Sequence, residues 1–499
     1  MSSRKILAIF LCFLSFQGLK AQVRVRLMPE ETFQTIQGFG ASGAWSNLLI
    51  NRWNDTERER VADWLFSCEQ PTDSTCRGIG LSVWRFNLGA GSTEQGDKSL
   101  IGDPFRRAEC FLDSGGKYNF DKQAGDQWML RAAALSGVNT ITLFVNSPPV
   151  SLTRNGKAFA AVCGTCNLDP QQYESYTDYL MQSILHFRKQ GIDIDYISPF
   201  NEPEWGWCQR DGQEGCPYTT QEIAAITRIL NRKLVEQGLE TRIQLPESGL
   251  LLFANSGYHF KPGRQNEINA FFHLRKKTYV GDLPKVAPQV CAHSYFSEWP
   301  LPAARMIRKK ICRLTHRREI EYWMTEYCIL KKTREIEGGG RDLGMHTALY
   351  VARVMHMDLV YGNASSWQWW LGMSVADYKD GLVYANRDGS GITDSKTLWM
   401  IGNFSRFVHP GAMRIGIDSN RKKDLLLSAY RNQDGSLVLV VINRSKEKQV
   451  LQLDNVAPAA VSAWETSAAR NLVKTGIFRS SDPLPVNAAS ITTFVFEKR

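Results

Sequence analysis

The stretch Tyr196-Ile197-Ser198-Pro199-Phe200-Asn201-Glu202-Pro203 runs from an apolar, β-rich segment directly into an acidic residue and a proline. A proline cannot donate a hydrogen bond within a central strand, and it biases the residue before it away from helical geometry. We therefore expect the strand to end near Phe200, with Glu202 at its carboxyl end. The segment Tyr322-Trp323-Met324-Thr325-Glu326-Tyr327 has the same arrangement further along the chain.

Around these two segments, short β-rich runs alternate with amphipathic helical patterns from about residue 36 to residue 375. The expected strands are 36–39, 81–86, 140–145, 196–200, 242–245, 289–293, 321–324 and 366–370. The expected helices include 121–135, 171–189, 220–236, 266–276 and 345–360. Eight strand–helix units predict an α/β fold of the (β/α)8 TIM barrel type over residues 36–400, with the active site at the carboxyl ends of the strands.

The pattern changes after Trp399 to alternating runs such as Leu437-Val438-Leu439-Val440-Val441-Ile442-Asn443, separated by turn signals such as Asn432-Gln433-Asp434-Gly435. Such runs are typical of antiparallel strands, and they predict an attached antiparallel β-sandwich over residues 401–499. The early run Val23-Arg24-Val25-Arg26-Leu27 also alternates. We expect residues 22–35 to contribute a strand to this sandwich.

The first 21 residues have the pattern of a secretory signal peptide. Arg4 and Lys5 precede an apolar run, and Ala21 ends a short segment before the polar Gln22. The apolar run is too short for a comfortable bilayer crossing, and no later run is long enough, so no membrane span is expected. We expect a protein that is secreted, periplasmic or held at the cell surface, and monomeric.

The charge and aromatic content narrow the class of partner. The formal net charge is +10, but the basic residues are spread along the chain in short runs such as Arg275-Lys276-Lys277, so no nucleic-acid partner is expected. The 14 tryptophans are more informative, because aromatic faces stack on the apolar faces of sugar rings. They favour a polysaccharide as the partner.

The cysteines outside the predicted signal peptide can form disulfides if the protein is exported. Cys68 with Cys76 and Cys208 with Cys216 have loop-sized spacings and are expected to form local disulfides. Cys163 and Cys166 have the spacing of a metal or redox site, but no second such pair follows. We therefore expect no metal there, but a disulfide or free thiols in a loop. Buried free thiols are expected at Cys110, Cys291, Cys312 and Cys328.

Glu202 and Glu326 are candidates for glycoside hydrolysis. This reaction needs two carboxyl groups that converge from different strands, one to protonate the leaving oxygen and one to meet the anomeric carbon. Either glutamate alone is more often a surface or helix-capping acid. Here both have apolar and aromatic neighbours, which raise the pKa of a carboxyl group. Asn201 is expected to hold a hydroxyl group of the sugar.

The motifs Asn201-Glu202-Pro203 and Thr325-Glu326-Tyr327 resemble those of clan A retaining glycosidases, and more specifically of glycoside hydrolase family 30. Further motifs that fit this family are Gly38-Phe39-Gly40-Ala41-Ser42, Ser147-Pro148-Pro149, His293-Ser294-Tyr295 and Asn403-Phe404-Ser405-Arg406-Phe407-Val408-His409-Pro410-Gly411-Ala412. The resemblance extends from about residue 22 to the C-terminus. It implies that Glu202 is the acid/base, that Glu326 is the nucleophile and that no cofactor is needed. One departure is Val150, where family members often have a tryptophan.

Within the family, the stretch Phe200-Asn201-Glu202-Pro203-Glu204-Trp205-Gly206-Trp207 looks most similar to endo-β-1,6-galactanases that act on arabinogalactan side chains. Glucuronoxylanases and β-1,6-glucanases of the same family are the alternatives. A carbohydrate-binding protein without catalysis is the alternative of another class. Such a protein has no use for two intact acids, so Glu202 and Glu326 favour an enzyme.

Other residues at strand ends are expected to bind the substrate: Arg85, Asn87, Asn146, Asn201, Trp205, Trp207, His293, Tyr295 and Trp370. The alternative to a substrate-binding role is a structural salt bridge for Arg85 and a buried position in the core for His293. Tyr295 is expected to donate its hydroxyl group to Glu326. Trp369 and Trp370 must point to opposite faces of their strand, and Trp370, nearer the carboxyl end, is expected to face the sugar.

Overall fold

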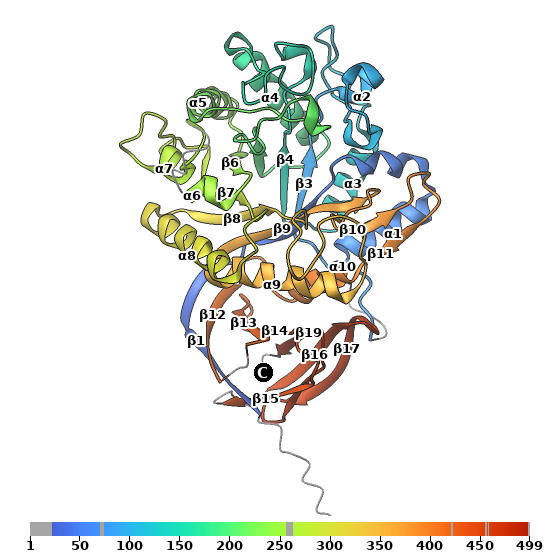
Figure 1. Cartoon of the computed structure of the whole chain (residues 1–499), viewed down its shortest axis with the longest axis vertical. Coiled ribbons are helices and arrows are strands. Elements are labelled where there is room, and N and C mark those ends of the chain that lie inside the picture. Colours follow the sequence, from blue (N-terminus) through green and yellow to red (C-terminus); the bar gives the residue numbers. More distant parts are fainter. Residues whose placement is uncertain are drawn as a thin grey trace, which may run out of the picture.

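The computed structural model describes residues 22–69, 74–255, 263–420, 423–454, 457 and 459–497. Eight strands form a closed parallel barrel in the upper half of the molecule (Figure 1). In chain order they are β2 (Gly38–Ser42), β3 (Val83–Asn87), β4 (Thr140–Phe144), β5 (Tyr196–Ser198), β6 (Arg242–Ser248), β7 (Val286–His293), β8 (Glu321–Glu326) and β9 (Ala364–Ser374). Pairing of β9 with both β2 and β8 closes the circle.

The fold therefore confirms the predicted TIM barrel, and every predicted strand is present. The short strands β10 (Gly381–Ala385) and β11 (Ile392–Asp394) extend the sheet beyond β9. Strand β6 extends three residues beyond the predicted end, to Ser248, and its last residues prove important for the site.

Helices connect the barrel strands: α1 (Asp55–Phe66), α2 (Ser92–Gln95), α3 (Ala124–Leu135), α4 (Tyr173–Lys189), α5 (Thr220–Glu236), α6 (Leu251–Asn255), α7 (Glu267–Phe272), α8 (Leu301–Arg318) and α9 (Met345–Tyr361). Helix α5 shows why they form. Thr219 and Glu222 make a capping box at its N-terminus, and apolar residues at helical spacing, including Ile223, Ile226 and Leu230, are buried along one face. Helix α7 is shorter than predicted, because the basic residues after Phe272 are exposed and offer no apolar face to bury.

A second sheet of nine strands lies below the barrel (Figure 1). It contains β1 (Val23–Thr35), β12 (Met413–Ser419), β13 (Leu425–Arg431), β14 (Leu437–Asn443), β15 (Gln449–Asp454), β16 (Ala460–Ser467), β17 (Arg470–Arg479), β18 (Leu484–Val486) and β19 (Ser490–Phe496). Strand β1 pairs antiparallel with β12 and parallel with β15, so both ends of the chain build this domain. The other pairs are antiparallel.

The two domains share apolar packing. One core cluster continues from the barrel to sandwich residues such as Val440, Trp464 and Ile491, and a second cluster lies within the sandwich. Helix α9 and helix α10 (Lys396–Ser405) pack between the two sheets. The boundary predicted at residue 400 falls within α10, at the junction of the domains, and the predicted domain limits stay a prediction.

The disulfide predictions were wrong in their pairing. Cys208 bonds to Cys163 and not to Cys216, and Cys68 keeps a free thiol, so its predicted bond to Cys76 is not made. Tertiary structure decides the pairing of Cys163 with Cys208. Backbone hydrogen bonds align the loops after β4 and β5 and bring these two cysteines together. Free thiols at Cys110, Cys291, Cys312 and Cys328 are confirmed, although Cys312 is only half-buried.

The predicted signal peptide lies outside the described residues. None of the helices in the described part of the chain has both the length and the apolar composition that a bilayer crossing requires.

Candidate active site

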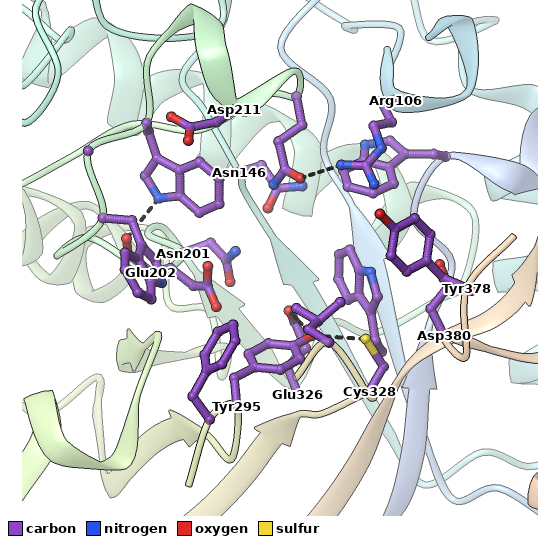
Figure 2. Close-up of a pocket in the computed structure, with 18 of the residues that line it drawn as sticks. Arg106, Asn146, Asn201, Glu202, Asp211, Tyr295, Glu326, Cys328, Tyr378 and Asp380 are labelled. Carbon is purple, nitrogen blue, oxygen red and sulfur yellow. Dashed lines mark hydrogen bonds between the residues drawn. The ribbon is translucent and has the colours of Figure 1, made fainter. Parts of the chain in front are cut away.

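A cleft of about 490 Å3 opens at the carboxyl ends of the barrel strands. Glu202 and Glu326 reach into it from the β5 and β8 sides (Figure 2). Other residues that line the cleft are Trp45, Arg106, Asn146, Asn201, Trp205, Gly206, Trp207, Arg210, Asp211, Gln213, Tyr295, Phe296, Cys328, Leu330, Trp370, Tyr378 and Asp380.

Glu202 follows β5 in a constrained loop. Its φ angle is 46°, in the left-handed region that non-glycine residues rarely adopt. Its backbone N–H donates to Glu247 O at 2.9 Å, and its carbonyl accepts from Trp207 Nε1 at 2.8 Å. Burial raises the pKa of its carboxyl group to about 7, although a hydrogen bond from His293 opposes the shift. A carboxyl group with this pKa can both give and take a proton near neutral pH.

Glu326 ends β8 and has different partners. Arg85 Nη1 donates to its Oε2 at 3.1 Å, and the Tyr295 hydroxyl group donates to its Oε1 at 2.9 Å. The hydrogen bond predicted from Tyr295 to Glu326 is therefore present. A carboxylate, rather than a carboxylic acid, matches two such donors.

His293 ends β7 and joins the acids beneath the cleft. Its Nδ1 lies 2.9 Å from Glu202 Oε1, and its Nε2 lies 2.9 Å from Glu247 Oε2. Burial lowers the pKa of its imidazole, but Glu326, Glu202 and Glu247 outweigh burial and raise it to about 10. The ring is therefore a cation at neutral pH, and both nitrogens donate.

Glu247 is a third carboxylate that we did not predict. It lies near the end of β6, fully buried, and accepts from Ser198 Oγ at 3.0 Å and from Thr325 Oγ1 at 2.6 Å. Burial raises the pKa of its carboxyl group, but Arg85, His293 and Thr325 outweigh burial and lower it to about 2. The signal was present in the sequence, since Pro246-Glu247-Ser248 follows the predicted strand as Glu202 follows β5.

The separation of the two cleft glutamates limits the chemistry. Carboxyl oxygens of Glu202 and Glu326 and a ring nitrogen of His293 all lie within 4.8 Å of one another. Three such groups can in general hold a metal ion. Here, both ring nitrogens of His293 are engaged in hydrogen bonds of 2.9 Å, with Glu202 and Glu247. The two carboxyl groups are thus close enough to act on neighbouring atoms of one bound ligand.

The predicted substrate-binding residues fall into two groups. Asn146, Asn201, Trp205, Trp207, Tyr295 and Trp370 line the cleft. Arg85 and His293 are fully buried and contact the acids from beneath. Asn87 faces a different cavity, and its Oδ1 accepts from Asn146 Nδ2 at 3.3 Å. Arg85 forms ion pairs with Glu326 and Glu247, and its predicted role in substrate binding stays a prediction.

Trp370 lines the cleft, whereas Trp369 packs on Tyr327, with 5.9 Å between ring centroids. The register between β2 and β9 shifts at this point: Ala41 pairs with Trp369 and Ser42 with Leu371, so Trp370 lies at a β-bulge. Bulges often redirect a side chain beside an active site. Trp370, the predicted choice of the two, therefore lies in the cleft wall, and its contact with a sugar stays a prediction.

Several lining residues were not predicted, because they lie on loops beyond the strand ends, where strand position gives no signal. Trp45, Arg106, Tyr378 and Asp380 are among them. Arg106 donates to Gln213 Oε1 at 3.0 Å on one wall, and Tyr378 and Asp380 lie on the side nearest Cys328 (Figure 2). Burial raises the pKa of Asp380 to about 6.

Two close carboxyl groups at the strand ends of a TIM barrel are typical of many glycoside hydrolases. The chain matches the family model described as O-Glycosyl hydrolase family 30 over residues 22–384. It also matches the model described as Glycosyl hydrolase family 30 beta sandwich domain over residues 411–494. The chain therefore belongs to glycoside hydrolase family 30.

Individual relatives are more distant. An endo-beta-1,6-galactanase of Hypocrea rufa is 27% identical over 241 residues, which are 45% of this chain and 49% of that protein. A glucuronoxylanase XynC of Bacillus subtilis is 26% identical over 343 residues, 66% of this chain and 67% of that protein. The solved structure of a conserved exported protein from Bacteroides fragilis is 31% identical, with a TM-score of 0.88, over 94% of this chain and 99% of that chain. The match thus spans about half of the galactanase.

Proposed function

We propose that the chain is a secreted retaining endo-glycosidase that cleaves a β-linked polysaccharide by double displacement. The observation that carries this proposal is the approach of Glu202 and Glu326 oxygens to within 4.8 Å. Retaining enzymes hold their carboxyl groups about 5–5.5 Å apart, whereas inverting enzymes need about 6.5–9.5 Å to seat a water between them.

In the first step, the Glu326 carboxylate attacks the anomeric carbon while Glu202 gives its proton to the leaving oxygen. The glycosidic bond breaks, and a covalent glycosyl-enzyme forms. In the second step, the Glu202 carboxylate takes a proton from water, the water oxygen attacks the anomeric carbon, and Glu326 is released. The pKa of about 7 suits Glu202 to both proton transfers, and the donors around Glu326 suit a nucleophile.

Glu247 and His293 position the Glu202 carboxyl group in this proposal. The negative charge of Glu247 favours the cationic form of His293, and His293 orients the Glu202 carboxyl group through a 2.9 Å hydrogen bond. Arg85 and Tyr295 orient Glu326 in the same way from the other side. Trp370 and the tryptophans after Glu202 offer aromatic surfaces to the bound sugars.

The proposed substrate is β-1,6-galactan of arabinogalactan side chains. Support comes from the residues around Glu202 and from the similarity to an endo-beta-1,6-galactanase. Glucuronoxylan stays the second candidate, because a glucuronoxylanase matches a larger part of the chain. β-1,6-Glucan is the third.

The test is incubation with all three polysaccharides, followed by measurement of reducing sugar and of product lengths. We expect release from β-1,6-galactan, with oligosaccharides of mixed length as the early products. Release from another polymer alone would reject the galactan assignment. Binding without any release, equal in the wild type and the Glu326→Gln variant, would instead indicate a carbohydrate-binding protein.

Export stays part of the proposal. It is supported by the signal-peptide pattern of residues 1–21 and by the similarity to a conserved exported protein. Cleavage near Ala21 is expected, and N-terminal sequencing of the protein from its natural host tests it. A monomer is expected and is tested by light scattering.

A further inference from the structure

A second cavity, of about 520 Å3, lies beside the cleft. The loops after β2 and β3 and the start of α3 form it, so it opens on the same face of the barrel as the catalytic acids. Its lining combines aromatic and polar side chains: Trp45, Leu48, Asn51, Arg52, Asn87, Thr93, Pro104, Phe105, Arg107, Ala108, Glu109, Gln123, Ala124, Gly125 and Asp126.

A thin wall separates the cavity from the cleft. Trp45 lines both spaces, and its ring meets Trp370 edge to face, with 5.4 Å between centroids. In the neighbouring segment, Phe105 and Arg107 line the cavity while Arg106, between them, lines the cleft. One loop therefore contributes to both spaces, and a ligand longer than the cleft meets the second cavity just past Trp45.

The lining has the chemistry of a sugar site. Trp45 and Phe105 supply apolar ring surface, and amide, hydroxyl, carboxyl and guanidinium groups lie around them. The guanidinium groups of Arg52 and Arg107 and the carboxyl groups of Glu109 and Asp126 are among them, and Arg107 also donates to Asp97 Oδ1 at 2.9 Å. A cavity that combines aromatic surface with many hydrogen-bonding groups suits a hydroxyl-rich ligand such as a sugar.

Two further observations indicate that the cavity is built for a ligand. Trp45 Nε1 is shielded from solvent and has no hydrogen-bond partner among the residues that the structure describes. Trp45 also has a φ angle of 57°, a strained backbone conformation for an aromatic residue. Strain of this kind and unsatisfied polar atoms concentrate at ligand sites, where function maintains them.

We propose that this cavity is a second carbohydrate-binding pocket, which holds one sugar unit of the polysaccharide whose scissile bond lies in the cleft. The proposal rests on the proposed function. The sugar has two possible sources: a more distant unit of the same backbone, or a side branch. Both present the same ring face and hydroxyl groups to the pocket.

The test uses the double variant Asn51→Ala/Arg52→Ala, because both side chains are exposed at the rim of the cavity and their loss should not impair folding. The matched control is Arg131→Ala/Asn139→Ala, which removes the same two exposed side-chain types at positions outside both cavities. Affinity is measured by calorimetry in the inactive Glu326→Gln background. The probes are linear β-1,6-galacto-oligosaccharides of increasing length and the same chains with arabinosyl branches.

We expect the rim variant to lose affinity about tenfold, which corresponds to about 1.4 kcal/mol, for the longer or the branched probes, and the control to lose none. A loss confined to long linear probes assigns the pocket to the backbone, and a loss confined to branched probes assigns it to a branch. Unchanged affinity for every probe, or an equal loss in the control, would overturn the proposal.

A second readout separates this proposal from the proposed function. In the otherwise wild-type enzyme, kcat/KM is measured on an aryl β-1,6-galactobioside, the shortest substrate of the series. We expect the rim variant to match the wild type on this substrate. An equal fall on the short substrate would show damage to the cleft and contradict the pocket. Absence of hydrolysis by the wild type itself would instead contradict the proposed function.

Discussion

The carboxyl ends of β5 and β8 present the same side chain in two different settings. Glu202 and Glu326 are almost equally shielded, with 7% and 4% of their surface exposed. Glu202 accepts a hydrogen bond from His293 and has a pKa of about 7, whereas Glu326 accepts from a guanidinium and a phenol group. The two carboxyl groups are thus almost equally buried but accept hydrogen bonds from different side chains. Two identical acids can therefore be prepared for the two roles that we propose by their hydrogen-bond donors.

Replacement of the β8 acid should have the largest effect. Glu326→Gln keeps the size of the side chain but removes the nucleophile, so no glycosyl-enzyme can form. We expect kcat to fall by about 10⁴-fold or more on the polysaccharide and on an aryl glycoside alike. Initial-rate assays on both substrates measure this. An appreciable rate on the aryl glycoside alone would remove Glu326 from the nucleophile role.

Replacement of the β5 acid should affect the two substrates differently. Glu202→Ala removes the proton donor, and we expect a loss of about 10²–10⁴-fold on the polysaccharide. An aryl glycoside with a good leaving group hardly needs that proton, so its glycosyl-enzyme should still form rapidly and then hydrolyse slowly. Stopped-flow measurement should show a burst of the phenol. Equal losses on both substrates, without a burst, would contradict the acid/base role.

The pH dependence of the wild type should follow the β5 acid. Because Glu202 must be protonated to act as the acid, kcat/KM on the polysaccharide should fall above pH about 7, by about tenfold per pH unit. Since kcat/KM reports the free enzyme, this limb reflects the pKa that burial raises before substrate binds. The same limb should be absent when Glu202→Ala acts on the aryl glycoside. Persistence of the limb in that variant would assign it to another group.

A smaller effect is expected from the carboxylate that lies beneath both acids. Glu247→Gln removes an anion that raises the pKa of His293. A smaller fraction of His293 is then protonated, and less positive charge lies beside Glu202. Without that cation the pKa of Glu202 rises, and the basic limb should move to higher pH by about one unit. Thr325→Val is the matched control, since it removes a hydrogen bond to Glu247 but no charge. A loss of activity with an unmoved limb would indicate a purely structural role.

The positions of the two acids were predictable, because an apolar strand that ends in an acid and a proline or aromatic residue is a local pattern. The barrel followed from the same kind of local signal repeated along the chain. Strand ends also predicted Asn146, Asn201 and Trp370 in the cleft wall, since parallel strands bring their carboxyl ends to one face.

Features that depend on contacts between distant segments were not predictable. The Cys163–Cys208 disulfide joins two loops that only the folded barrel brings together. Asn87 occupies a strand end as predicted, but the loops after β2 and β3 enclose it in the second cavity. Glu247 is a different case, because it follows the strand predicted at 242–245 almost directly and was a local signal that we missed; pairing with β7 extends that strand to Ser248.

Azide rescue tests the assignment of the two glutamates most directly. Azide needs no general base, so it should restore turnover of an aryl β-glycoside by Glu202→Ala and attack the glycosyl-enzyme to give a glycosyl azide of β configuration. With Glu326→Ala, azide should occupy the space of the missing nucleophile and give the α-azide. Proton NMR distinguishes the two products. A β-azide from the position 326 variant together with an α-azide from the position 202 variant would reverse the roles and contradict the account.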